Sequence, residues 1–225
     1  LYGTKNLSKF IKKTAQNIFI PLSVGGGIYT LDHIKELLDS GADKICINSA
    51  VVKNLSFLDK AVKLIGSSNI VINIEYVKID NESYVTTSLG RDLSEIKLKK
   101  WAKIVENSGA GEIVLTSINN EGIGQGFDLK NIKEISENIK VPVIAHGGAG
   151  NFHHIYEVIK KTQISGVMIA SLFHYDLAGN FKFKKPSVGN TSFLQNELKK
   201  KPQFNLRKLK QFLKKKNILV RNEKN

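Results

Sequence analysis

Residues 141–150 read VPVIAHGGAG, an apolar run with a proline that ends in a cluster of glycines. The run is typical of a buried strand, and the glycines after it let backbone N–H groups approach an anion without interference from a Cβ atom. The N-terminus of the next helix adds a partial positive charge there. Residues 19–28, FIPLSVGGGI, repeat this arrangement about 120 residues earlier. Two such cradles in one domain predict a ligand that carries two phosphates.

Strands and helices alternate along the chain with little sequence between them. Short apolar runs such as residues 70–74 predict strands of a parallel sheet that helices cover. We expect strands at 18–24, 44–48, 70–74, 112–116, 141–145 and 166–170, with a hairpin through 76–87. We expect helices at 7–16, 31–39, 55–65, 93–108, 129–138, 152–161 and 206–215. Periodicity alone fits both a (βα)8 barrel and a doubly wound sheet, but phosphate cradles after several different strands favour the barrel.

The helix ends carry their own signals. Thr30 is expected to cap the helix that starts at residue 31, and Asp92 or Ser94 the helix that contains Trp101. Gly41 and Gly109 follow helix ends, where glycine is favoured.

Length and charge narrow the class of protein. The 225 residues fit one domain, and no apolar run is long enough to span a membrane. The net charge of +14 comes mostly from lysine without interleaved aromatic residues, which favours a lysine-rich solvated surface over nucleic-acid binding. The single cysteine, Cys46, excludes an internal disulfide and fits a reducing cytoplasm. Because the chain begins at Leu1 and its only methionine is Met168, we expect a fragment or a processed chain.

Five phrases appear in order, at residues 24–28, 41–50, 109–117, 146–150 and 170–174. The set resembles the family of HisF, the cyclase subunit of imidazole glycerol phosphate synthase, over about residues 17–175 and less closely over the final helix at 205–221. The resemblance implies a (βα)8 TIM barrel, a glutaminase partner of the HisH type at the N-terminal face of the barrel, and ammonia that travels through the barrel. That ammonia would react with a bis-phosphorylated ribulosyl ribonucleotide in histidine biosynthesis.

The resemblance also implies that the chain begins after the second strand. Residues 1–225 would then be a single partial barrel without strands 1 and 2, and would be inactive alone. An insertion is expected at about 176–204, either a ligand lid or an inert segment.

The same resemblance assigns roles to individual residues. Glu75 falls where the family has a catalytic aspartate, although a solvated glutamate at a strand end would look the same. The expected phosphate or substrate residues are Gly27, Asn48, Ser49, Gly122, Gly147, Gly148, Ala170 and Ser171. The expected ammonia gate and partner contact are Asp43, Lys44 and Glu112, which could equally form surface ion pairs.

Other positions depart from the family pattern. Asn119 replaces an acidic residue, and His146 stands where serine is common and either touches a phosphate or fills a site shaped for another ligand. The histidine spacing suggests no metal, and no cofactor is expected.

Two alternatives to the cyclase stay open. A relative of the family could supply ammonia for sugar amidation in surface polysaccharide synthesis, which Glu75, Asn119, His146 and the 176–204 segment favour. A non-catalytic scaffold that binds a phosphorylated ligand or a glutaminase is the second alternative.

Overall fold

The computed structural model describes residues 4–174 and 204–221. Its strands are β1 (Ser23–Gly25), β2 (Lys44–Ile47), β3 (Ile70–Ile79), β4 (Glu82–Thr87), β5 (Asp92–Lys97), β6 (Glu112–Ser117), β7 (Val143–His146) and β8 (Gly166–Met168). Its helices are α1 (Thr4–Ala15), α2 (Leu31–Asp39), α3 (Ser49–Lys53), α4 (Ser56–Ile65), α5 (Leu98–Asn107), α6 (Leu129–Asn138), α7 (Phe152–Lys161) and α10 (Leu206–Lys215), with a 3-10 turn at Ser67–Asn69. Within the described ranges, no helix has the length and apolar character needed to cross a bilayer.

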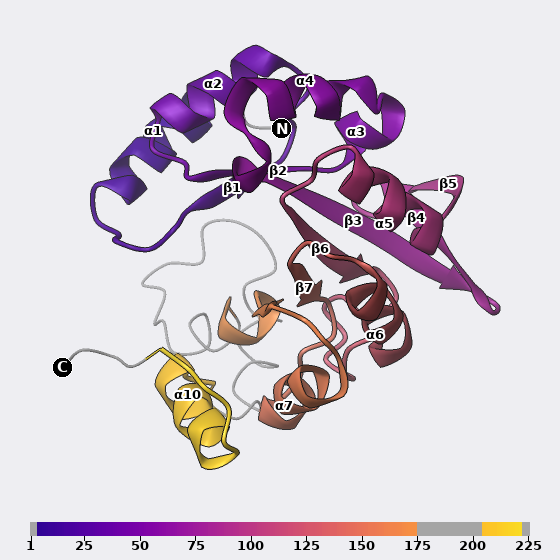
Figure 1. Cartoon of the computed structure of the whole chain (residues 1–225). Helices are drawn as coiled ribbons and strands as arrows, with labels where there is room; N and C mark the ends of the chain where they lie inside the picture. Colours follow the sequence, from indigo (N-terminus) through magenta and orange to yellow (C-terminus); the bar gives the residue numbers. More distant parts are fainter. Residues whose placement is uncertain (1–3, 175–203, 222–225) are drawn as a thin grey trace, which may run out of the picture.

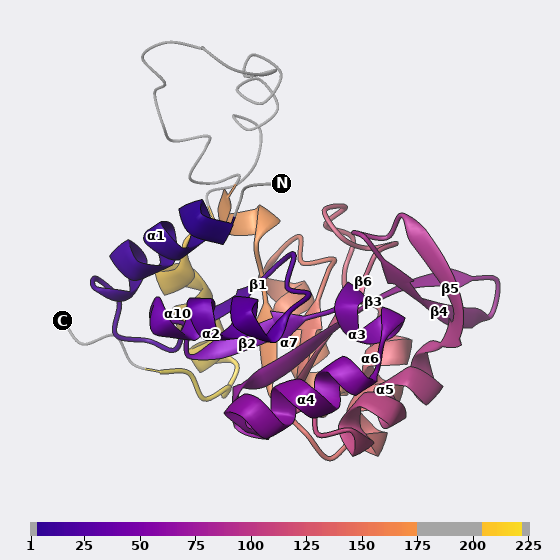
Figure 2. The same ribbon diagram turned by 90° about the horizontal axis from the view of Figure 1, so that it is seen from above.

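Six of the strands run parallel, in the order β1-β2-β3-β6-β7-β8. The strands β4 and β5 continue from β3 as an antiparallel ribbon. The sheet curls, and the helices lie along its outer side (Figures 1 and 2). The described part is therefore a half-barrel, which confirms the predicted TIM-barrel class in partial form.

The two faces of the curled sheet have different character. Ile72, Ile113 and Val143 are paired across three neighbouring strands and are at most 2% exposed, so they form part of the layer under the helices. Side chains on opposite faces alternate along a strand. Glu75, Thr116 and His146, which are also paired across β3, β6 and β7, therefore lie on the inner face.

Some of the predicted helix caps are present in the structure, and others are not. The Thr30 side chain accepts a hydrogen bond from the His33 N–H, which confirms the predicted cap of α2. Gly41 and Gly109 follow α2 and α5 with φ of +104° and +92°, as a glycine after a helix end predicts. The caps proposed at Asp92 and Ser94 are wrong, because α5 begins only at Leu98.

The first part of the expected helix at 93–108 is a strand, β5, and the helix α5 begins only after it. Residues 92–97 pair with β4, and the Ser94 hydroxyl donates to the Val85 carbonyl over 2.7 Å. Leu93 is 57% exposed, so this segment buries no helical stripe. Its alternating exposed and half-buried side chains suit an outer strand with charged residues.

The first predicted strand is shorter than expected. Only Ser23–Gly25 pairs with β2, whereas Phe19 and Ile20 are 94% and 58% exposed. Pro21 has no N–H, and the Leu22 N–H donates to the Asp43 carboxylate over 2.7 Å and not to a neighbouring strand. The short helix α3 was also missed by the sequence analysis.

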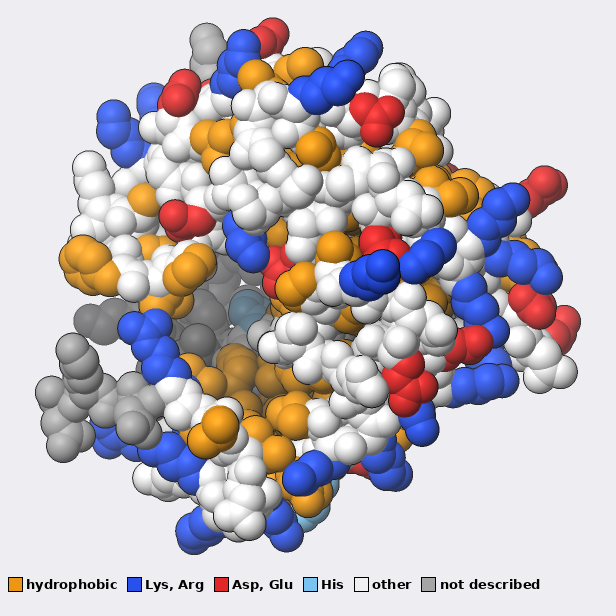
Figure 3. Space-filling view, viewed as in Figure 1, with side chains coloured by type: hydrophobic (Ala, Val, Ile, Leu, Met, Phe, Trp, Pro, Cys, Tyr) orange, Lys and Arg blue, Asp and Glu red, His pale blue; other side chains and the backbone are white. Residues whose placement is uncertain are grey.

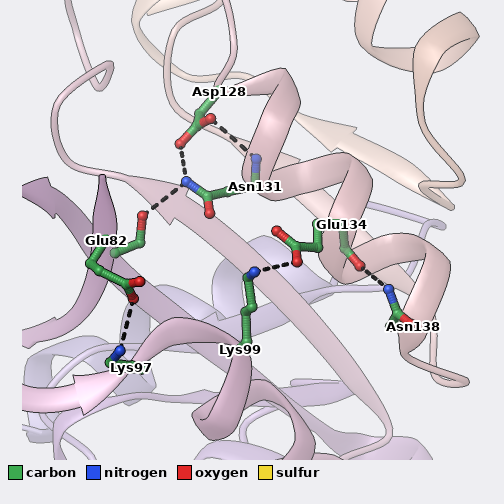
Figure 4. Close-up of polar contacts among 8 residues, drawn as sticks. Glu82, Lys97, Lys99, Asp128, Asn131, Glu134 and Asn138 are labelled. Carbon is green, nitrogen blue, oxygen red and sulfur yellow. Dashed lines mark hydrogen bonds and ion pairs between the residues drawn. The ribbon is translucent and has the colours of Figure 1, made fainter. Parts of the chain in front are cut away.

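Polar contacts hold the ribbon together, join it to α6, and join α5 to α6 (Figure 4). The buried Asn131 amide donates to the Ser83 hydroxyl over 2.9 Å and to the Asp128 carboxylate over 2.7 Å. Ion pairs join Lys97 to Glu82 and Lys99 to Glu134. Asn131 is the buried member of this set and ties the start of α6 to β4.

The last helix lies where the sequence placed it, at Leu206–Lys215. It packs on α7 through aromatic rings, with centroids 5.6 Å apart for Phe152 and Phe212. Phe204, just before the helix, lies 4.4 Å from the ring of Phe152. The predicted insertion at about 176–204 lies outside the described residues, except for Phe204.

Candidate active site

The carboxyl ends of the parallel strands bring the candidate catalytic residues together. In a barrel of this type the functional side chains follow these strand ends. Glu75 of β3 pairs with Thr116 of β6, and Thr116 pairs with His146 of β7. These three residues form a row across the inner face, which we call the inner row.

Glu75 is buried, with 6% of its surface exposed. Its Oε1 accepts a hydrogen bond of 3.4 Å from the Asn73 amide, while Oε2 has no hydrogen-bond partner among the described residues. Burial raises the pKa of the Glu75 carboxyl. The Gly90 N–H and the Asn48 side chain lie near the carboxyl and partly oppose this shift. A carboxyl in this setting suits proton transfer better than a solvated glutamate would.

A chain of hydrogen bonds links Glu75 to His146. The Thr116 hydroxyl donates to the side-chain Oδ1 of Asn73 over 2.8 Å and lies 3.1 Å from His146 Nδ1. Burial lowers the pKa of His146, and the charge of Glu121 opposes that shift. The sequence does not connect His146 with Glu75, because the link through Asn73 and Thr116 depends on the strand register.

The first glycine stretch leaves room for a ligand. Gly27 has φ +68°, and a Cβ atom built there would meet nothing within 4 Å. Asn48 and Ser49 follow β2, and Asn48 lies beside Glu75. The buried Oδ1 of Asn48 has no partner in the described part of the chain. The Ser49 hydroxyl accepts from the N–H of Ser88 in the ribbon over 3.3 Å.

The second glycine stretch is packed against a loop. The Gly126 N–H donates to the Gly148 carbonyl over 2.8 Å, and a Cβ atom at Gly148 would lie 2.0 Å from the Gly126 oxygen. At Gly147 the Cβ atom would lie 2.8 Å from the Ser117 oxygen. Close backbone contact therefore requires glycine here, whether or not an anion binds. Beyond β8, the His174 N–H donates to the Ala170 carbonyl over 2.9 Å, so Ser171 lies in a helical turn.

The loop after β6 carries Gly122, which has φ +76° and open space where a Cβ atom would be. Asn119, in the same loop, accepts from the Lys78 N–H over 2.7 Å and so fixes the loop to β3. Glu121 is exposed, and its charge acts on both Glu75 and His146.

The predicted gate residues lie at the other end of the strands. Lys44 and Glu112 form an ion pair of 2.5 Å and are 35% and 14% exposed. The Asp43 carboxylate is engaged by the Leu22 N–H, so it holds the chain that enters β1. Cys46, two residues after Lys44 on the same face, is half-buried, and burial raises the pKa of its thiol to about 11.

The surface of the described part has a hollowed face and a small cavity. Figure 3 shows a hollowed face between the N-terminal helices and α10, with apolar side chains gathered on its floor. A cavity of about 200 Å³ lies between the ribbon and α6, and five lysines line it: Lys78, Lys97, Lys99, Lys100 and Lys130. Within residues 4–174 and 204–221, no three His, Cys, Asp or Glu side chains are grouped closely enough to hold a metal ion.

Comparison with known proteins settles the family. Residues 2–178 match the family described as histidine biosynthesis protein, and the chain belongs to that family. Within it, the chain is similar to proteins named imidazole glycerol phosphate synthase subunit HisF. The protein from Hydrogenobaculum sp. strain Y04AAS1 is 44% identical over 165 residues, which cover 73% of this chain and 66% of that protein.

Two further relatives carry the same name. The Bacillus cereus AH187 protein is 42% identical over 174 residues, covering 77% of this chain and 69% of the relative. The Sulfurisphaera tokodaii protein is 41% identical over 172 residues, which cover 76% of this chain and 68% of that relative. The chain thus spans about two thirds of the length of the curated relatives it matches. These matches confirm the predicted family and support the predicted role in histidine biosynthesis, as a lyase subunit of imidazole glycerol phosphate synthase.

Proposed function

We propose that the protein is the cyclase subunit of an imidazole glycerol phosphate synthase. It uses ammonia from a glutaminase to convert a bis-phosphorylated ribulosyl ribonucleotide, and Glu75 transfers protons in the reaction. The observation that carries the proposal is the buried Glu75 carboxyl near the end of the parallel part of β3, with an oxygen on the inner face that has no hydrogen-bond partner among the described residues. The burial of this carboxyl argues against a solvated glutamate.

The two phosphates of the substrate are assigned to the two glycine stretches. Gly27, Asn48 and Ser49 would hold one phosphate, and the open space at Gly27 supports this. The residues Gly147, Gly148, Ala170 and Ser171 would hold the other, and Gly122 would approach the substrate from the loop after β6. Because packing alone explains Gly148, the first site has the stronger support.

A glutaminase of the HisH type is the proposed partner. It would dock at the N-terminal end of the strands, where the Lys44–Glu112 pair and Asp43 lie. A hollow there is lined by the exposed Phe19 and Ile20, which supports a protein contact. A cytoplasmic location and a single domain with an insertion at about 176–204 belong to the same proposal.

The test is turnover by the intact protein, with an ammonium salt in place of the glutaminase. Glu75→Gln keeps the shape of the side chain and removes its proton, and loss of about 100-fold or more in kcat is expected for an acid–base residue. Glu95→Gln is the matched control, because that carboxyl is exposed on β5 and takes no part in the pKa shifts of Glu75 or His146. Equal turnover by Glu75→Gln and the wild type would contradict the assignment of Glu75.

Sugar amidation remains a second candidate, since Asn119 and His146 depart from the family pattern. Complementation of a histidine auxotroph by the complete gene separates the two. Growth supports the cyclase, whereas a folded protein that binds its glutaminase but gives no growth supports amidation.

A further inference from the structure

The inner row has a titratable group at each end. Glu75 Oε2 at one end is buried and has no hydrogen-bond partner among the described residues, although the Gly90 N–H and the Asn48 side chain lie near the carboxyl. At the other end, His146 makes its hydrogen bond through Nδ1, which leaves Nε2 for a ligand. Between them stand Asn73 and Thr116, whose hydrogen bonds connect the two groups. Neighbouring strands are about 4.8 Å apart, so the Cα atoms of Glu75 and His146, two strands apart, are separated by about 10 Å.

The hydrogen bonds in this row fix one tautomer of His146. Glu75 Oε1 accepts from Asn73, so the Asn73 amide nitrogen faces Glu75 and its oxygen faces Thr116. The Thr116 hydroxyl has a single proton, which it donates to that oxygen. Thr116 can then only accept from His146, so the proton of the neutral ring is on Nδ1 and Nε2 has a free lone pair.

The direction of the row does not depend on the charge of Glu75. A protonated carboxyl keeps one oxygen as an acceptor, so Oε1 can accept from Asn73 while Oε2 holds the proton. Both ends can therefore be neutral at once, with an acid at Oε2 and a base at Nε2.

We propose that His146 is a catalytic base of this enzyme, which acts through Nε2 and is held in the required tautomer by Thr116 and Asn73. This inference rests on the proposed function, because it concerns the same reaction. Thr116 and Asn73 are positioning residues, since they act through His146. Nothing in the family pattern points to this role, because serine is common at the position of His146.

The step that needs this base is the addition of ammonia to the ketose carbonyl of the substrate. A C–N bond forms as the C=O π bond breaks, and the oxygen receives the electron pair. His146 Nε2 takes one proton from the attacking nitrogen, and Glu75 Oε2 gives one proton to the oxygen. The product is a neutral carbinolamine, and the row has lost one proton and gained one.

The surroundings of His146 keep its ring neutral near pH 7. Burial lowers its pKa from the ordinary value of 6.5, which favours the neutral ring at pH 7. Glu121, on the loop after β6, opposes this shift, and Glu75 of β3 lies at the far end of the row. On the β8 side the residue paired with His146 is the uncharged Met168.

The first experiment measures kcat and KM across pH, with an ammonium salt and the bis-phosphorylated substrate. His146→Ala should lower kcat by about 100-fold or more, as expected when an acid–base group is lost, and added imidazole should restore part of it. The acidic limb of the pH profile should disappear in the variant. If wild-type protein turns over and His146→Ala matches it, the inference is overturned. If the intact wild-type protein folds but does not turn over the substrate, the proposed function fails instead.

The second experiment does not need activity. Nitrogen NMR of ¹⁵N-histidine-labelled protein, with His146 assigned from its variant, reports which ring nitrogen carries the proton. The expected result is the Nδ1–H tautomer in the wild type and in Thr116→Ser, and a mixture of tautomers in Thr116→Val. An Nε2–H tautomer in the wild type overturns the inference. So does a folded Thr116→Val protein in which His146 keeps the same tautomer as in the wild type.

Discussion

Substitution of alanine at Gly148 and at Gly27 separates the two reasons for glycine in this chain. Both residues have positive φ, +111° at Gly148 and +68° at Gly27, so alanine is strained at each. The surroundings differ: a Cβ atom at Gly148 would lie 2.0 Å from the Gly126 oxygen, whereas none at Gly27 would meet an atom within 4 Å. Gly148 is therefore expected to matter for folding, and Gly27 for the ligand.

The expected magnitudes follow from these contacts. A residue forced into a rare backbone conformation costs about 1–3 kcal/mol. At Gly148 the loop must also move away, and the Gly126 N–H hydrogen bond of 2.8 Å is lost, which adds about 1 kcal/mol. We expect Gly148→Ala to lower the free energy of unfolding by about 2–4 kcal/mol, and Gly27→Ala by about 1 kcal/mol, near the low end of the strain range because its φ is close to the left-handed helical value.

Thermal and denaturant unfolding of both variants measure the difference. For a chain of this size 1 kcal/mol shifts Tm by about 2–4 °C, so Gly148→Ala should melt about 4–16 °C below the wild type. Gly27→Ala should melt within a few degrees of the wild type and lose affinity for inorganic phosphate. Equal losses of stability in the two variants would refute the reasoning from Cβ contacts.

Two further predictions concern stability. Because burial raises the pKa of Glu75 above its ordinary 4.5, the protonated form contributes stability below that pH, and the contribution is lost as pH rises through the folded value. Glu75→Gln should thus match the wild type near pH 4 and be the more stable protein at pH 7 and above in urea unfolding; a constant difference would contradict this. Asn131→Ala removes two hydrogen bonds of the buried amide, one to a carboxylate, and should cost about 2–4 kcal/mol. Asn138→Ala, with one exposed bond to the Glu134 carbonyl, should cost less than about 0.5 kcal/mol, and a similar loss in both would exclude a special role for Asn131.

Much of the fold could be predicted because its signals are local. The apolar run at residues 70–74 becomes the centre of the sheet, since helices cover one face and the inner layer the other. The caps at Thr30 and the glycines after α2 and α5 are fixed by bonds within a few residues, so the sequence alone shows them.

The errors come where a distant partner decides. Residues 92–97 have no strong strand pattern of their own and become β5 because β4 offers them hydrogen bonds. Phe19 and Ile20 read as buried, yet no described element covers them. In both segments the local pattern is weaker than the tertiary environment.

The candidate site was predictable residue by residue, but its connections were not. Glu75 and the pair Lys44 and Glu112 follow from position in the motif, and the ion pair confirms that these last two meet. The inner row depends on the register that sets Thr116 opposite both Glu75 and His146. A shift of one residue would move these side chains to opposite faces.

Burial of the inner row shifts the pKa values of Glu75 and His146 in opposite directions, and the two shifts together have a chemical consequence. Desolvation favours the neutral form of any group, so it raises the pKa of Glu75 and lowers that of His146. A neutral carboxyl is an acid and a neutral imidazole is a base, and opposite pKa shifts in two neighbouring groups are how one site keeps both available at one pH. A serine in place of His146 would leave Glu75 without this counterpart. The resemblance implies that serine is common at position 146 in the family, so histidine there is expected to change where the proton of the attacking nitrogen goes, while the fold stays the same.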